Sequence, residues 1–88
     1  MKRNPDFLLR EVAGTLVIVP VGEASANFKG MITLNATSAY LWELLETEQT
    51  QQSLVDALTA RYDVDAETAA KDVENFIQKL SVVEAVTQ

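Results

Sequence analysis

The sequence predicts an α+β fold in which a small antiparallel sheet is followed by a cluster of three helices. The first third of the chain contains short runs rich in β-branched residues, and glycines separate these runs. From residue 35 onward, apolar residues recur instead at the spacing of amphipathic helices. The chain has 88 residues and few Gly or Pro, so a single domain spanning residues 1–88 is expected.

The expected strands lie in the first part of the chain. Residues 7–12 and 15–21 are two β-rich runs, and the pair Ala13-Gly14 between them suits a tight hairpin turn. Residues 22–30 are small and polar, which predicts a loop. The third expected strand, residues 31–34, is short and leads directly into the first helix.

Each expected helix begins at a residue suited to cap it. Asn35, Thr50 and Asp65 carry side-chain oxygens that accept hydrogen bonds from backbone N–H groups one turn further on. Residues 81–86, after the third helix, fit either a final strand or a frayed helix end, and a short terminal extension is expected. The apolar stripes of the three helices are Ala39, Leu41, Trp42, Leu44 and Leu45, then Leu54, Val55, Leu58 and Tyr62, then Ala69, Val73, Phe76, Ile77 and Leu80.

Three strands followed by three helices are typical of a winged-helix-like domain. Such domains often bind DNA, and a DNA-binding regulator is therefore one alternative for the function. The predicted third helix, however, sets Lys71 and Lys79 against Glu67, Asp72 and Glu74, and it has no arginine to read a guanine edge. The formal net charge of −6 would also repel nucleic acids and anionic membranes. No nucleic-acid or membrane partner is predicted.

The residue types present exclude most catalytic chemistry. The chain contains no Cys and no His, which removes Cys-His and Ser-His catalysis, disulfides and zinc clusters. Its three glycines are too far apart to form a phosphate-binding loop. The acidic run at residues 63–67 lacks the glycine of a calcium loop and is better explained by capping of the third helix. No catalytic residue, cofactor or metal is predicted, and the protein is expected not to be an enzyme.

No apolar run approaches the ~20 residues of a membrane span, and no signal peptide follows the basic start. A cytoplasmic location is expected.

The third expected strand has an unusual feature for an edge strand. Residues 31–34 contain neither a charge nor a proline to protect an open edge. Such an edge can accept an extended peptide as an added strand, or a second copy of the chain in a homodimer. The alternative is that the terminal extension or the preceding loop covers it. Phe28 in that loop is either an exposed contact residue or a cover for the loop.

The helical part resembles a known family. The segment LNATSAYLWELLE, with LVDALTARYDVDAETAAKDVENFIQKL after it, is similar to the pyrroloquinoline quinone biosynthesis protein D (PqqD-like) family. Members show Leu-Asn-x-Thr at the first helix, an aromatic or aliphatic pair before Leu-Leu, a Thr-led second helix and Asp-Val-x-x-Phe in the third. The matching residues are Leu34, Asn35, Thr37, Trp42, Leu44, Leu45, Thr50, Asp72, Val73, Phe76 and Leu80.

The resemblance implies a recognition element for ribosomally made, post-translationally modified peptides. Such a domain holds the leader of a precursor peptide as an added strand and presents it to a modifying enzyme, often a radical S-adenosylmethionine enzyme. Carried over to this chain, the resemblance implies backbone pairing by Met31, Ile32, Thr33 and Leu34. It also implies a groove wall on the third helix made by Asp72, Phe76 and Lys79, although the opposite flank, with Ala70, Glu74 and Ile77, is an alternative.

Overall fold

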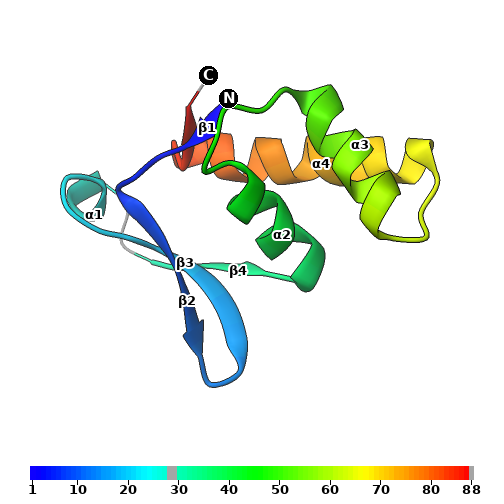
Figure 1. Cartoon of the computed structure of the whole chain (residues 1–88). Helices are drawn as coiled ribbons and strands as arrows, with labels where there is room; N and C mark the ends of the chain where they lie inside the picture. Colours follow the sequence, from blue (N-terminus) through cyan, green and yellow to red (C-terminus); the bar gives the residue numbers. More distant parts are fainter. Residues whose placement is uncertain (28–29, 88) are drawn as a thin grey trace.

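The computed structural model describes residues 1–27 and 30–87, and Phe28 lies outside this part of the chain. The predicted α+β class is confirmed: a three-stranded antiparallel sheet precedes the main helices (Figure 1). The predicted third strand and third helix are β4 and α4. The elements are β1 (Lys2–Arg3), β2 (Phe7–Val12), β3 (Thr15–Pro20), α1 (Ala24–Asn27), β4 (Ile32–Leu34), α2 (Ala36–Leu44), α3 (Gln51–Arg61), α4 (Ala66–Val82) and β5 (Val86–Thr87).

The sheet has the strand order β2-β3-β4, so β3 lies in the centre. Ala13 and Gly14, which join β2 to β3, have φ angles of 52° and 79°. Two successive residues with positive φ are typical of the tight turns whose twist matches that of a hairpin. In the register between the strands, Val17 of β3 faces Arg10 of β2 on one side and Thr33 of β4 on the other.

The three predicted N-caps are confirmed. Asn35 Oδ1 accepts a hydrogen bond from the Ser38 N–H at 2.8 Å, and Asp65 Oδ1 accepts one from the Thr68 N–H at 2.7 Å. Thr50 forms a reciprocal capping box at the start of α3. Each cap satisfies a backbone donor that the helix itself leaves unpaired, which sets where each helix begins.

Asp65 makes the stability of α4 depend on pH. Hydrogen bonds to its side chain from the backbone N–H of Thr68 and from the Thr68 side chain hold the pKa of this exposed carboxyl below its ordinary value. A lowered pKa in the folded state contributes stability above the pKa of the unfolded chain, and this stability is lost as the pH falls below about 4.

The Asp65→Asn variant tests this contribution, because asparagine also caps helices but does not titrate. Between about pH 6 and pH 3, the wild type should lose more unfolding free energy than the variant, since every other carboxyl is common to both. Urea denaturation at several pH values measures the difference. Equal losses of unfolding free energy in the wild type and the variant would contradict the assigned role of Asp65.

The hydrophobic core lies between the inner face of the sheet and the helices. Trp42, Leu41 and Leu80 are each at most 1% exposed, and Ile18 of the central strand is fully buried against them. Of the aromatic residues on the predicted apolar stripes, Trp42 and Phe76 are buried, whereas Tyr62 is half-buried. The core also contains Phe7, Ile32, Leu34, Ala39, Leu45, Leu54, Val55, Leu58, Ala69, Val73, Ala85 and Val86.

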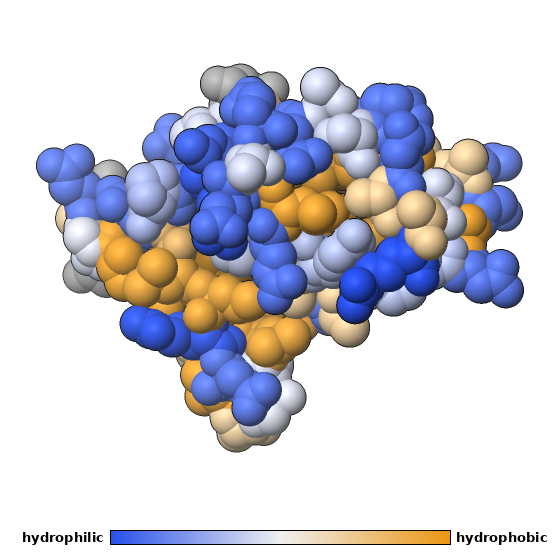
Figure 2. Space-filling model, in the orientation of Figure 1, coloured by the Kyte–Doolittle hydropathy of each residue, from blue (hydrophilic) through white to orange (hydrophobic). Residues whose placement is uncertain are grey.

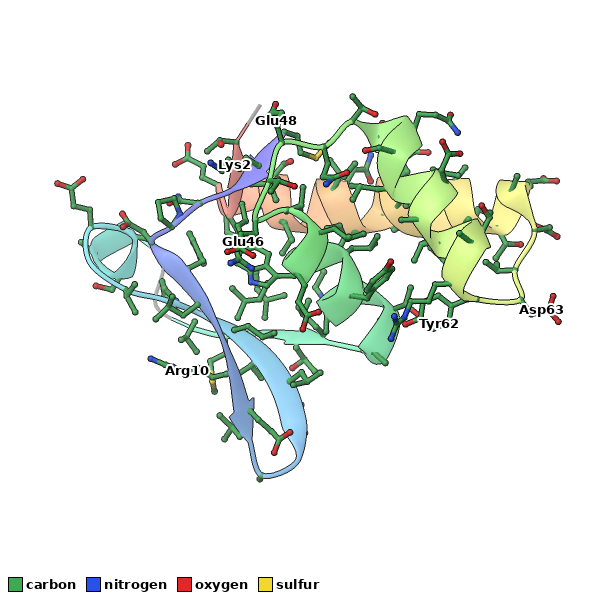
Figure 3. The ribbon with its side chains drawn as sticks, viewed as in Figure 1. Lys2, Arg10, Glu46, Glu48, Tyr62 and Asp63 are labelled. Atoms are coloured by element: carbon green, nitrogen blue, oxygen red, sulfur yellow. The ribbon has the colours of Figure 1, made fainter. Side chains whose placement is uncertain are left out.

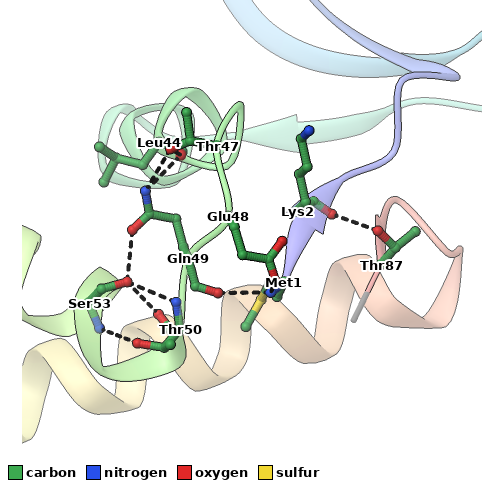
Figure 4. Close-up of polar contacts among 9 residues, drawn as sticks. All are labelled: Met1, Lys2, Leu44, Thr47, Glu48, Gln49, Thr50, Ser53 and Thr87. Atoms are coloured by element: carbon green, nitrogen blue, oxygen red, sulfur yellow. Dashed lines mark hydrogen bonds and ion pairs between the residues drawn. The ribbon is translucent and has the colours of Figure 1, made fainter.

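The two ends of the chain form a second, two-stranded sheet that the sequence did not predict. Lys2 of β1 pairs with Thr87 of β5, and the amino group of Met1 contacts Glu48 and the Gln49 carbonyl (Figure 4). The terminal segment therefore forms a strand after α4 and lies beside the N-terminus, and it does not pair with β4 (Figure 1). Strands of two residues are too short to show an alternating sequence pattern, and these two are brought together only by tertiary contacts.

Other details differ from the prediction, and β3 ends at Pro20, one residue earlier than expected. The segment predicted as a loop over residues 22–30 contains the short helix α1, whose first turn is held by a hydrogen bond from the Ser25 hydroxyl to the Gly22 carbonyl. The third strand begins at Ile32, so Met31 precedes it. None of the helices described is long and apolar enough to cross a membrane.

Candidate functional site

One edge of β4 is open. In the described part of the chain β4 pairs with β3 on one side only. The carbonyl oxygen of Thr33 accepts a hydrogen bond from the Lys79 ammonium at 3.1 Å, so this carbonyl points away from β3. In an antiparallel strand the N–H and C=O of one residue point to the same side. The open edge therefore presents both the donor and the acceptor of Thr33.

A groove runs beside this edge, between β4, the start of α2 and α4. It has a volume of about 210 Å³. Leu34, Leu41 and Phe76 form its apolar floor and are each at most 5% exposed, whereas Asp72 and Lys79 at the rim are exposed. The remaining lining residues are Asn35, Thr37, Ser38 and Asn75. A buried apolar floor with polar walls suits one or two side chains of an extended chain better than a drug-sized molecule, whose sites are larger.

The wall of the groove follows from the periodicity of α4. Asp72, Asn75, Phe76 and Lys79 are spaced i, i+3, i+4 and i+7, so they lie along one face of the helix. Ala70, Glu74 and Ile77, on the alternative flank, do not line this groove.

A second, smaller hollow continues past the start of α2. Its volume is about 110 Å³, and it shares Thr37 and Asp72 with the first. Its other lining residues are Leu58, Tyr62 and Val64. The Tyr62 ring packs edge-on against the Tyr40 ring of α2, with 6.0 Å between ring centroids, whereas neighbouring Asp63 points away from the helices (Figure 3). The two hollows therefore adjoin at Thr37 and Asp72.

The structure brings four of the seven predicted site residues together in the groove: Leu34, Asp72, Phe76 and Lys79. Thr33 meets the groove through its backbone contact with Lys79. Ile32 is buried in the core, and Met31 is 59% exposed just before β4. Sequence reasoning did not assign Asn35 or the α2 residues Thr37, Ser38 and Leu41 to the groove, because only the tertiary fold brings them beside α4. It also missed Asn75, which helical spacing from Asp72 would have identified.

The sheet carries exposed apolar residues outside the groove. Leu8, Val12 and Met31 are 37%, 48% and 59% exposed, and hydrophobic surface is gathered over the β2–β3 hairpin (Figure 2). Among the described residues, no three acidic side chains are placed to hold a metal ion. Larger hollows lie between β1 and β2, and between α1 and the end of α4, but neither includes a residue of β4.

Comparisons with known proteins agree with this fold. A family model described as coenzyme PQQ synthesis protein D (PqqD) matches residues 15–85. The solved structure of TbiB1 in complex with the TbiA(beta) leader peptide is similar, with a TM-score of 0.74 and 25% sequence identity over 97% of this chain and 93% of that chain. No curated protein gives a significant sequence match.

Proposed function

Because this chain belongs to the PqqD family, we propose that it is a peptide-binding adaptor that takes the leader of a ribosomally made precursor peptide as an added strand on β4. The observation that carries the proposal is the open backbone of Thr33 beside an apolar groove. The solved neighbour, which shares the fold over nearly its whole length, is itself a complex with a leader peptide.

Strand addition would use the features of the site in a simple way. An extended peptide exchanges main-chain hydrogen bonds with the Thr33 N–H and C=O, and its alternate side chains face opposite sides. Side chains on one side enter the hollow floored by Leu34, Leu41 and Phe76, while those on the other side lie near Met31. A few such bonds and one or two buried side chains, less the cost of ordering the peptide, correspond to a Kd on the order of micromolar.

The proposal gives the chain a presenting role without chemistry of its own. Its lack of His and Cys fits an adaptor better than a catalyst. The adaptor would hand the peptide to a modifying enzyme, with a radical S-adenosylmethionine enzyme as the first candidate, in the cytoplasm. No observation favours DNA binding, since exposed Asp72 and Glu74 accompany the lysines on α4.

A backbone NMR titration tests the binding site. With a synthetic leader from a precursor gene next to the gene of this chain, amide signals should shift at residues 31–34 and 72–79, and at Thr37 and Ser38. A scrambled peptide and a short DNA duplex serve as controls. Shifts confined to the two larger hollows would overturn the β4 site, and shifts with the duplex alone would overturn the adaptor function. Line widths that grow with protein concentration would instead indicate a homodimer through this edge.

A further inference from the structure

Lys79 covers the Thr33 carbonyl oxygen, which an added strand needs as a hydrogen-bond acceptor. It lies in the last turn of α4, and its ammonium donates to the Thr33 carbonyl across 46 residues of sequence. The described residues place no carboxylate in an ion pair with Lys79. Its hydrogen bond to Thr33 is therefore the polar contact that holds this side chain across the open edge.

We propose that Lys79 is a displaceable cap on the Thr33 carbonyl. A bound peptide would replace the Lys79 ammonium with one of its own backbone N–H groups, and the groove would select peptides with an acidic side chain next to that N–H. This inference rests on the proposed function, and it names the chemistry of the preferred peptide.

The selectivity follows from what displacement costs. A hydrogen bond from an ammonium group is stronger than one from a neutral amide. A neutral peptide that pairs with the Thr33 carbonyl breaks this stronger bond, and the exposed Lys79 ammonium is then left with water as its partner. A peptide carboxylate at this point gives the ammonium an ion pair in place of the lost contact. An acidic peptide residue therefore compensates for the lost Lys79–Thr33 hydrogen bond, whereas an uncharged residue does not.

The other charged group facing the groove limits where the acidic residue can lie. Asp72 is on the same face of α4 as Lys79, seven residues earlier, which is about 10 Å along the helix axis. Its carboxylate disfavours an acidic side chain at that end. The groove thus has a cationic end near Thr33 and an anionic end near Thr37, so an acidic side chain is favoured at the first end and disfavoured at the second.

The same contact explains how the free protein protects its edge. Edge strands are commonly protected by charges or prolines of their own, and β4 has neither. Here the charge comes from α4, and it is placed directly over the exposed carbonyl. The Lys79 cap therefore has two effects. It disfavours strand pairing between copies of the chain, and an acidic peptide can displace it.

Selection from a displayed library of random peptides of about 12 residues tests the inference and does not require the sequence of the leader. The full chain, Lys79→Met and Lys71→Met are used as targets. Lys71 is a matched control because it is an exposed lysine on α4 that does not line the groove. Peptides selected by the wild type and by Lys71→Met should carry Asp or Glu at one fixed position, and those selected by Lys79→Met should not.

One selected peptide is then compared with its Asp→Asn or Glu→Gln version by calorimetry. The change should weaken binding to the wild type about two- to fivefold and leave binding to Lys79→Met nearly unchanged, which is the signature of a direct pair. The neutral version should bind Lys79→Met more tightly than it binds the wild type, because no cap has to be displaced. Equal losses in all three proteins would overturn the role of Lys79 while leaving the adaptor function intact. Failure of all three proteins to select any peptide would overturn the proposed function itself.

Discussion

Thr33→Pro is expected to weaken peptide binding about tenfold or more while leaving the fold intact. Proline removes the backbone N–H that points to the open edge of β4, and its ring occupies the space of the incoming strand. The hydrogen bonds between β4 and β3 are kept, because the polar groups of Thr33 do not face β3. Proline is tolerated at such edge positions, and Ile32 before it is already extended. Calorimetry with a peptide selected by the wild type measures the loss.

The matched control places the same ring on the opposite edge of the sheet. In the register, Val17 faces both Thr33 and Arg10, so its polar groups point towards β2 and pair with Arg10. Alternation then directs the N–H of the next residue, Glu11, to the open edge of β2. Glu11→Pro should bind peptide like the wild type. If Glu11→Pro loses affinity and Thr33→Pro does not, the peptide docks on β2 and the site assignment is wrong.

Trp42→Ala is expected to lower the free energy of unfolding by about 3–5 kcal/mol, a large part of the total for a domain of this size. Trp42 is 1% exposed, and the Arg3 guanidinium lies 5.8 Å from its ring centroid. Its removal would leave a cavity where α2 meets the sheet and would also loosen the N-terminal strand. Urea denaturation followed by circular dichroism measures the change.

Val82→Ala is the control for this loss. Val82, at the end of α4, is 84% exposed, so its truncation should change the unfolding free energy by no more than about 0.5 kcal/mol. A loss for Trp42→Ala as small as that for Val82→Ala would show that the helices do not pack on the sheet as described.

The core and the groove share residues, which decides how binding can be studied. Leu34, Leu41 and Phe76 form the floor of the groove and are also members of the core. Truncating any of them would reduce stability and affinity together. The backbone of Thr33 and the rim residue Lys79 are therefore the positions at which binding can be altered while the core is preserved.

Much of the fold could be predicted from local patterns. The hairpin turn at Ala13-Gly14 and the caps at Asn35, Thr50 and Asp65 depend on residues within a few positions of one another. Local hydrogen bonds and alternation fix such elements, so the sequence displays them directly. The groove wall of Asp72, Phe76 and Lys79 was identified from the family resemblance, because periodicity alone left two flanks of the third helix open.

Contacts between distant segments were beyond the reach of the sequence. The pairing of β1 with β5, the contribution of Thr37 and Ser38 to the groove, and the Lys79 cap on Thr33 each join residues that are far apart in the chain. By itself, the sequence determined where strands and helices form and which of their faces are apolar, because these properties depend on near neighbours. The tertiary structure alone decided that β4 keeps an open edge and that Lys79 of α4 covers the Thr33 carbonyl on it. Both features depend on how packing of the core brings separate elements together.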